Sequence, residues 1–386
     1  MSSLSRTVAL AGLSTRALAE SAARAGFRVV ACDAFADIDL QRCARVLPLP
    51  GGAGQGYTAR DAALALGAIT ASYAAYTSNY ENEPEAVRLL AWRRILLGNP
   101  PSVLRAVRDP FRLRRFLRRS GFPAPVVRAS APATGRDWVR KPRRSGGGRR
   151  VVRWRRGMLV PRATYLQEHI AGTPCSIVFA ADGRRTVPFG WSRQLVGERR
   201  LGARGFRYAG SILIRPRDRL VPRGEAAHER AIALAEAITS RFRLVGVNGI
   251  DFVVRRGIPF PVEVNPRYSA SMELVERACG CSVFQLHLDA SRGRLGEVPP
   301  GRFVTRQAMG KAIVYARQAL TLGDTRPWLA DPSVGDIPHA GARIGRGHPI
   351  CTVFASGRSG AACRTALFRR AARLYRELAA MKRSLV

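Results

Sequence analysis

The chain has 386 residues, enough for two or three structural units with separate cores. Hydrophobic residues make up 46% of it, which excludes gross disorder, and the formal net charge of +37 predicts attraction to nucleic acid, membrane surfaces or polyphosphates. The lysines number only three, so a coding bias toward arginine explains this charge as well as a functional partner does. The seven cysteines form no CxxC pair, which argues against a disulfide framework and a structural zinc site.

The N-terminal region is expected to be an α/β domain. TVALAGL (7–13) and FRVVACDAF (27–35) are typical of short strands, and the alanine-rich segment between them is typical of a helix. A transit peptide has a similar composition, but the strand–helix–strand interpretation accounts for the apolar pattern better. The glycines of 48–61 fit neither phosphate-loop nor dinucleotide-binding spacing, so this segment is interpreted as a plain loop.

The middle of the chain is expected to mix helices and hairpins. The expected elements are a helix within 96–125, a basic glycine-rich hairpin with a mobile tip at 138–154, two strands within 165–190, and helices at about 225–243 and 270–280.

The C-terminal region is expected to form a small β-rich unit that ends in an amphipathic helix. Leu367, Ala371, Leu374 and Leu378 form one stripe of that helix, and arginines occupy its other faces. The helix either docks on its own domain or lies on a membrane surface, and docking is favoured. No apolar run is long enough to span a bilayer, and we expect the protein to be cytoplasmic.

The stretch GIDFVVRRGIPFPVEVNPRYSA (249–270) keeps acids in a chain where they are scarce. It is predicted to form a β-hairpin in which Glu263 and Asn265 share one face and Asp251 lies near Glu263 on the neighbouring strand. Two adjacent carboxylates repel unless a cation lies between them, and hard oxygen ligands suit Mg²⁺. Arg267 follows directly and could hold a phosphate or an oxyanion. The alternative is an exposed hairpin whose acids pair with surface arginines.

Lys141 and the glycines at 146–148 form a second candidate site. Glycines allow backbone N–H groups to approach a phosphate, and lysine supplies a compact charge. Because the chain uses arginine almost everywhere else, a lysine just before a glycine-rich loop indicates selection for its shape.

Taken in order, RKP with SGGG, then YLQEHIAG, then GIDFVV with EVNPR, the sequence resembles the ATP-grasp superfamily over about residues 5–360. The pattern is similar to predicted carboligases related to biotin carboxylase. The resemblance implies a mixed α/β and α+β fold in three parts. They are a Rossmann-like pre-grasp domain at 1–95, an ATP-grasp domain at 96–298 with a mobile lid at about 124–168, and a small β-rich unit at 299–386.

The resemblance also implies roles for particular residues. Asp251, Glu263 and Asn265 would bind Mg²⁺, with Mn²⁺ as an alternative, and Arg267 would stabilise the reacting acyl phosphate. Gln194 is a further nucleotide contact. One departure is the absence of the lysine that many relatives carry near the start of the helix after Asp109. Either a nearby arginine substitutes for it, with Arg108, Arg112 and Arg114 as candidates, or the contact is lost. The residues expected to bind ATP are Lys141, Gly146, Gly147, Gly148, Gln167, Glu168, His169 and Ile170.

The implied activity is ADP-forming, ATP-dependent ligation of a small carboxylate to an amine through an acyl phosphate. The substrates would include anionic molecules, and the pattern has a loose association with pterin-type one-carbon cofactor synthesis. A carboxylase-like enzyme that uses bicarbonate is the alternative within the enzyme class. A basic nucleic-acid-binding protein without catalysis ranks below both, because the arginines do not interleave with aromatic residues. A homodimer is expected and a membrane partner is not.

Overall fold

The computed structural model describes residues 6–49, 56–132, 137–296, 303 and 305–383. Part of the glycine-containing loop at 48–61 and the expected domain boundary at 298/299 therefore lie outside the described residues.

The first domain contains a five-stranded parallel sheet with the order β3-β2-β1-β4-β5. Alternate residues of β1 enter the cores on the two faces of the sheet, Val8 and Leu10 on one face and Ala9 and Ala11 on the other. The predicted strand–helix–strand start is confirmed. The elements are β1 Thr7–Gly12, α1 Arg16–Arg24, β2 Arg28–Asp33, β3 Arg45–Val46, α2 Ala59–Gly67, β4 Tyr73–Tyr76, α3 Pro84–Leu90 and β5 Ile95–Leu96.

The segment after the first sheet forms two helices, α4 Pro101–Val107 and α5 Pro110–Arg119, where one helix was predicted. The break falls at Asp109, whose carboxylate accepts hydrogen bonds from the next backbone N–H groups, while Pro110 takes the first helical position. A proline there has no N–H to lose and disfavours helix at the residue before it, so a second helix begins.

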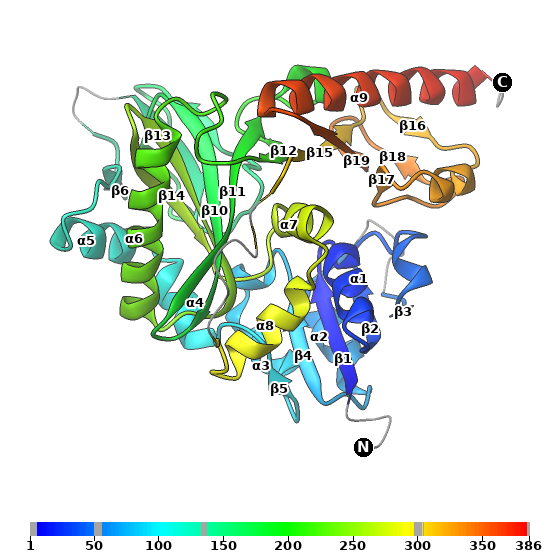
Figure 1. Ribbon diagram of the computed structural model, residues 1–386, viewed down its shortest axis with the longest axis horizontal. Helices are drawn as coiled ribbons and strands as arrows, with labels where there is room; N and C mark the ends of the chain where they lie inside the picture. The colour runs from blue at the N-terminus through cyan, green and yellow to red at the C-terminus, as the bar shows by residue number, and fades with distance from the viewer. Residues whose placement is uncertain (1–5, 50–55, 133–136, 297–302, 304, 384–386) are drawn as a thin grey trace.

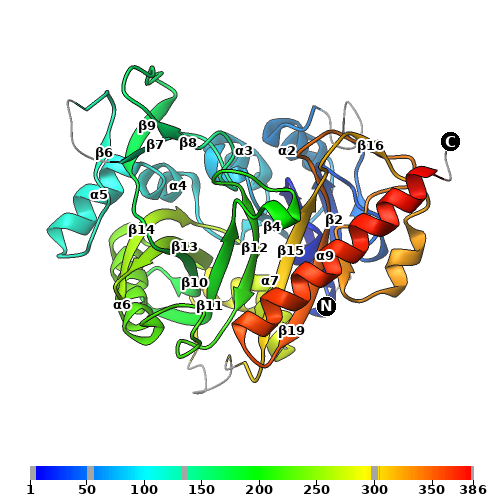
Figure 2. The same ribbon diagram turned by 90° about the horizontal axis from the view of Figure 1, so that it is seen from above.

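A four-stranded antiparallel sheet with the order β6-β9-β7-β8 follows, and Figure 2 shows it next to α5 at one end of the molecule. The predicted hairpin is confirmed, with Trp138 opposite Trp154 and the glycine-rich loop between the strands. The strands are β6 Val127–Arg128, β7 Trp138–Pro142, β8 Val152–Trp154 and β9 Thr164–Glu168.

The largest sheet has eight strands in the order β14-β13-β10-β11-β12-β15-β19-β17. Its last three strands come from the region expected to be a separate C-terminal unit, and β12 pairs directly with β15. That region therefore continues the central sheet. The strands are β10 Thr173–Asp182, β11 Thr186–Val196, β12 Tyr208–Leu213, β13 Val245–Arg255, β14 Ile258–Asn265, β15 Ala308–Tyr315, β17 Val334–Gly335 and β19 Pro349–Gly357, and β16 Leu320–Thr321 pairs separately with β18 Arg343–Ile344.

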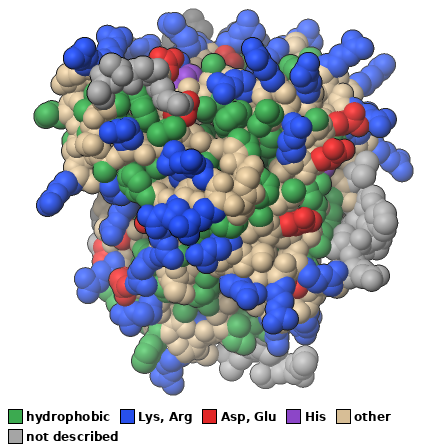
Figure 3. All heavy atoms as spheres, turned by 90° about the vertical axis from the view of Figure 1, so that its left-hand side faces the viewer, with side chains coloured by type: hydrophobic (Ala, Val, Ile, Leu, Met, Phe, Trp, Pro, Cys, Tyr) green, Lys and Arg blue, Asp and Glu red, His purple; other side chains and the backbone are tan. Residues whose placement is uncertain are grey.

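Helices cover the large sheet. The core beneath α6 and α9 is the largest in the protein, and Figure 1 shows α9 lying across the C-terminal strands. Basic side chains cover much of the face that carries α5 and α6 (Figure 3). These helices are α6 Gly224–Phe242, α7 Met272–Cys279, α8 Val283–Ser291 and α9 Gly360–Arg383; short 3₁₀ helices are η2 Leu40–Arg42, η3 Tyr80–Asn82, η4 Arg199–Leu201 and η5 Arg326–Ala330.

The C-terminal helix docks on its own sheet, as the favoured interpretation predicted. Leu367, Ala371, Leu374 and Leu378 are all buried in the core that α9 shares with β15 and β19. A helix whose apolar stripe is covered in this way has no free face for a membrane surface. In the part of the chain that the structure describes, none of the helices combines the length and the apolar character needed to cross a bilayer.

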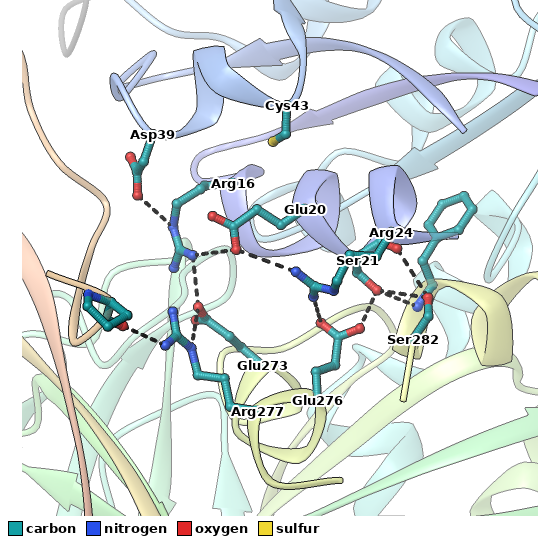
Figure 4. A network of polar contacts seen from close by, with 12 residues as sticks. Arg16, Glu20, Ser21, Arg24, Asp39, Cys43, Glu273, Glu276, Arg277 and Ser282 are labelled. Atoms are coloured by element: carbon teal, nitrogen blue, oxygen red, sulfur yellow. Dashed lines mark hydrogen bonds and ion pairs between the residues drawn. The ribbon is translucent and has the colours of Figure 1, made fainter. Parts of the chain in front are cut away.

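A buried charge network holds α1 against α7 (Figure 4). The Arg16 guanidinium lies 2.8 Å from a carboxylate oxygen of Glu273 and 3.4 Å from one of Asp39. Lys311 of β15 lies 2.6 Å from the other oxygen of Glu273. Because these charges are buried, each depends on the others for compensation. The network therefore ties α1 of the first domain to α7 and to β15 of the large sheet.

Candidate active site

The β13–β14 hairpin carries the predicted acids. Arg255 pairs with Ile258, so the loop consists of Arg256 and Gly257, both with positive φ, as in the tight hairpin turn that matches strand twist. A register shift between Asp251 and Phe252 then moves the pairing by one residue and places Asp251 opposite Glu263. The bulge therefore brings the two carboxylates together, as the sequence required.

Amide side chains surround the Asp251 carboxylate. Gln194 Nε2 donates to one oxygen at 2.8 Å and Asn265 Nδ2 donates to the other at 2.9 Å. Burial, together with the neighbouring charge of Glu263, raises the pKa of Asp251 to about 6. A buried carboxylate that is held only by neutral donors can accept a cation. Asp251, Glu263 and Asn265 thus converge as predicted, and Gln194 joins them.

Arg108 and Lys141 supply positive charge next to Glu263. Arg108 forms an ion pair with the Glu263 carboxylate, and Lys141 Nζ donates to Val262 O and Gln167 Oε1, each at 3.2 Å. Although burial acts to raise the pKa of Glu263, these two cations hold it below its usual range. The carbonyl of Val262 is available to Lys141 because Val262 lies at the bulge, outside the regular strand pairing.

Arg108 also joins three parts of the chain, a role that the sequence suggested only as a substitution for a missing lysine. Besides Glu263, its guanidinium donates at 3.1 Å to Val264 O, Asn82 Oδ1 and Ser145 O. Asn82 belongs to the first domain and Ser145 to the glycine-rich loop. Arg108 therefore links the hairpin, the loop and the first domain in one contact set.

Arg267 lies on the other side of Asn265. Its guanidinium donates to Asn265 Oδ1 at 3.2 Å and to Tyr268 O at 3.0 Å, and it lies 2.7 Å from Glu81 Oε1. The Glu81 side chain is fully buried, and its second oxygen has no hydrogen-bond partner among the described residues. Sequence reasoning missed Glu81 and Asn82, because nothing local in η3 links Glu81 to Arg267, 186 positions away, or Asn82 to Arg108 and Ser145, 26 and 63 positions away.

The glycine-rich loop is closed over this cluster. Gly147 and Gly148 have positive φ, and the Gly147 carbonyl accepts a hydrogen bond from the Tyr208 N–H at 3.0 Å. A Cβ added to Gly148 would lie 1.9 Å from Phe206 O, so a side chain at this position is incompatible with the closed loop. A Cβ at Gly146 would lie 3.9 Å from Glu81 Oε1. Closure of the loop against the segment that leads into β12 thus requires glycine at position 148, whereas position 146 has room for a Cβ beside Glu81.

The segment from Gln167 to Ile170 leaves β9 beside the same cluster. The Gln167 side chain is buried and contacts Lys141, while the Glu168 and His169 N–H groups donate to Val126 O and Asp137 O, each at 2.7 Å. These bonds tie the segment to the strands and loops around the four-stranded sheet β6-β9-β7-β8. The structure brings Gln167 to the cluster, and a contact of Glu168, His169 or Ile170 with adenine stays a prediction.

Comparisons with known proteins agree with this architecture. Residues 107–271 match the family described as the ATP-grasp domain. The L-amino acid ligase of Bacillus licheniformis has a similar structure, with a TM-score of 0.68, 16% identity and coverage of 95% of this chain and 96% of that one. Carboxyaminoimidazole ribonucleotide synthase of Aspergillus clavatus, solved with ATP, has a TM-score of 0.70 and 16% identity, with coverage of 96% of this chain and 100% of that one. Biotin carboxylase of Campylobacter jejuni has a TM-score of 0.68 and 12% identity, with coverage of 92% of this chain and 87% of that one.

One curated relative also matches, an uncharacterized protein of Methanocaldococcus jannaschii that is 27% identical over 118 residues. The match covers 31% of this chain and 28% of that protein, so the chain spans little more than a quarter of the relative's length. The structural likenesses show the fold alone, and together with the family match they establish an ATP-grasp fold related to that of biotin carboxylase. The predicted resemblance is therefore confirmed as a family match over residues 107–271 and as a likeness of fold over nearly the whole chain.

Proposed function

We propose that this ATP-grasp protein is an ATP- and Mg²⁺-dependent ligase that activates a substrate carboxylate and joins it to an amine, with release of ADP. The observation that carries the proposal is the convergence of Lys141, Arg108 and Arg267 on the carboxylates of Asp251 and Glu263, beneath a closed glycine-rich loop. A polyphosphate requires cations on one side and a metal-holding set of oxygens on the other, and this arrangement offers both.

The donor set fits Mg²⁺. Two facing carboxylates and an amide oxygen are hard ligands, and waters with phosphate oxygens would complete the shell. Within the described part of the chain, no group of three His, Cys, Asp or Glu residues lies close enough to hold an ion, so the third protein ligand would be the Asn265 amide. When bound, Mg²⁺ would neutralise polyphosphate charge.

In the proposed reaction the substrate carboxylate attacks the γ-phosphorus of ATP, which gives an acyl phosphate and ADP. The amine then attacks the acyl carbon, an amide forms, and phosphate leaves. Lys141 and Arg108 would hold the phosphates, and Arg267 would stabilise the oxyanion that develops. The glycine-rich loop would exclude water, because hydrolysis of the acyl phosphate would waste ATP.

The proposal is tested by ADP release with pooled carboxylates and amines, followed by oxygen tracing. We expect carboxylate-dependent ADP release, and a carboxylate labelled with ¹⁸O should pass one labelled oxygen to the released phosphate. Hydroxylamine in place of the amine should give a hydroxamate. ADP release that does not depend on a carboxylate, or phosphate without the label, would refute acyl-phosphate chemistry.

The same assay tests two more specific forms of the proposal, one that concerns the acid and one that concerns the acceptor. The likeness to a carboxyaminoimidazole ribonucleotide synthase and to biotin carboxylases favours bicarbonate as a second candidate acid. Labelled bicarbonate would then pass its oxygen to phosphate. A pterin acceptor in one-carbon cofactor synthesis remains a prediction of the sequence resemblance, and stimulation of ADP release by a reduced pterin would support it.

A further inference from the structure

Helix α5 exposes four arginine side chains within its ten residues, namely Arg112, Arg115, Arg118 and Arg119. Across the described ranges, none of these four guanidinium groups forms an ion pair with an acid. The nearest acid in sequence, Asp109, is occupied at the helix N-terminus by two backbone N–H groups. The helix therefore presents uncompensated positive charge to solvent.

The fold arranges these charges in a row. Arg112, Arg115 and Arg119 are spaced by three and four residues, so they follow one face of α5 over about 10 Å. Shallow hollows flank the row. One, of about 380 Å³, is lined by Phe111, Arg114, Arg115, Arg118, Arg119 and Val127.

The second hollow, of about 220 Å³, adds an arginine from α6 and is lined by Arg112, Arg115, Phe116, Arg119, Arg241 and Phe242. Figure 3 shows basic side chains gathered over this face with few acidic ones between them. We call the four exposed arginines of α5, together with Arg241, the arginine face.

The chemistry of this face suits phosphodiesters. Guanidinium groups bind phosphate oxygens in a bidentate manner, and a row of them can follow successive phosphates. In the described parts of the chain, exposed large apolar side chains lie on elements other than α5. The arginine face therefore has no exposed apolar side chain that could insert into a membrane. Phe116 is half-buried and Phe242 is buried, so their rings offer little surface for base stacking.

We propose that the arginine face binds the sugar–phosphate backbone of nucleic acid without reading base sequence. This function is separate from the proposed ligase reaction, because none of the five arginines contacts the residues around Asp251 and Glu263. Four of these arginines are neighbours in the sequence of α5, and folding places Arg241 of α6 beside them.

The test is fluorescence anisotropy with a labelled 20-nucleotide RNA of mixed sequence, over 50–300 mM salt. One variant carries Gln at positions 112, 115, 118 and 119. The control carries Gln at Arg369, Arg370, Arg373 and Arg376, four exposed arginines of α9, so both variants lose the same net charge. Glutamine keeps helix propensity in both cases. Binding of an Mg²⁺–ATP analogue by both variants checks that the fold is intact.

We expect the α5 variant to bind RNA at least 10-fold more weakly at 150 mM salt. Its slope of log affinity against log salt should be smaller by up to about 3, since each single-strand phosphate contact contributes about 0.7. The control should stay within about threefold of wild type. Equal weakening of both variants, or absence of RNA binding by the wild type, would overturn the proposal. A parallel measurement uses anionic lipid vesicles. If the α5 variant loses binding to the vesicles but keeps binding to RNA, the proposal is also overturned. None of these results depends on whether the ligase reaction occurs.

Discussion

Replacement of Arg108 by methionine tests whether one arginine joins the glycine-rich loop to the β13–β14 hairpin. Two of its contacts reach outside the hairpin, both at 3.1 Å: Ser145 O in the glycine-rich loop and Asn82 Oδ1 in the first domain, which itself contacts Ser145 O. Hydrogen bonds from a charged donor contribute about 1.5 kcal/mol or more each, so losing two should cost about 3 kcal/mol, or about 100-fold in affinity for an Mg²⁺–ATP analogue.

Calorimetry of the wild type, Arg108→Met and Arg108→Lys measures this effect. Lysine keeps the charge beside Glu263 but cannot span all the acceptors at once, so an intermediate loss of about 10-fold is expected. Arg112→Met, on the exposed surface one turn away, is the matched control and should change affinity by less than twofold. If Arg108→Met remains folded and binds the analogue within threefold of wild type, Arg108 has no part in closing the site.

Other substitutions separate the metal, the loop and the charge network. Glu263→Gln should abolish the Mg²⁺ dependence of ATP-analogue affinity, measured with and without the ion. Gly148→Ala should lower ADP release at least 10-fold, because its Cβ cannot be accommodated in the closed loop, whereas Gly157→Ala, also at positive φ but in open space, should not. Glu273→Gln should lower the free energy of unfolding by about 3 kcal/mol at pH 7, measured by denaturant titration. Since buried cations hold the pKa of Glu273 below its usual range, its stabilisation is present above about pH 4.3 and is lost as pH falls, so wild type and variant should converge in acid.

The β13–β14 hairpin shows how much of the candidate site the local sequence pattern predicts. Alternation placed Glu263 and Asn265 on one face, and counting from the turn placed Asp251 within one residue of Glu263. The remaining one-residue shift of register comes from a bulge at Val262, beside Pro261, and strand alternation alone does not reveal it. The same bulge leaves the carbonyl that Lys141 contacts, so part of the site geometry depends on an irregularity that pattern analysis does not detect.

Long-range contacts account for what sequence reasoning missed. Glu81 meets Arg267 across 186 residues, and Arg108 meets Glu263 across 155. Nothing in the spacing of the first domain indicates that its η3 turn reaches the site. The pairing of β12 with β15 is also long-range, so nothing local indicated that strands of the expected β-rich C-terminal unit would extend the central sheet.

Calorimetry of ATP-analogue binding in moderate salt, with and without Mg²⁺, tests the central claim most directly, for wild type, Glu263→Ala and Lys141→Ala. The salt suppresses loose association of any polyphosphate with so basic a protein. Our account predicts binding that requires Mg²⁺, survives the salt and is lost in both variants. Binding that ignores Mg²⁺ and both substitutions, and that fades with salt, would contradict it and leave ATP as a counterion of the surface.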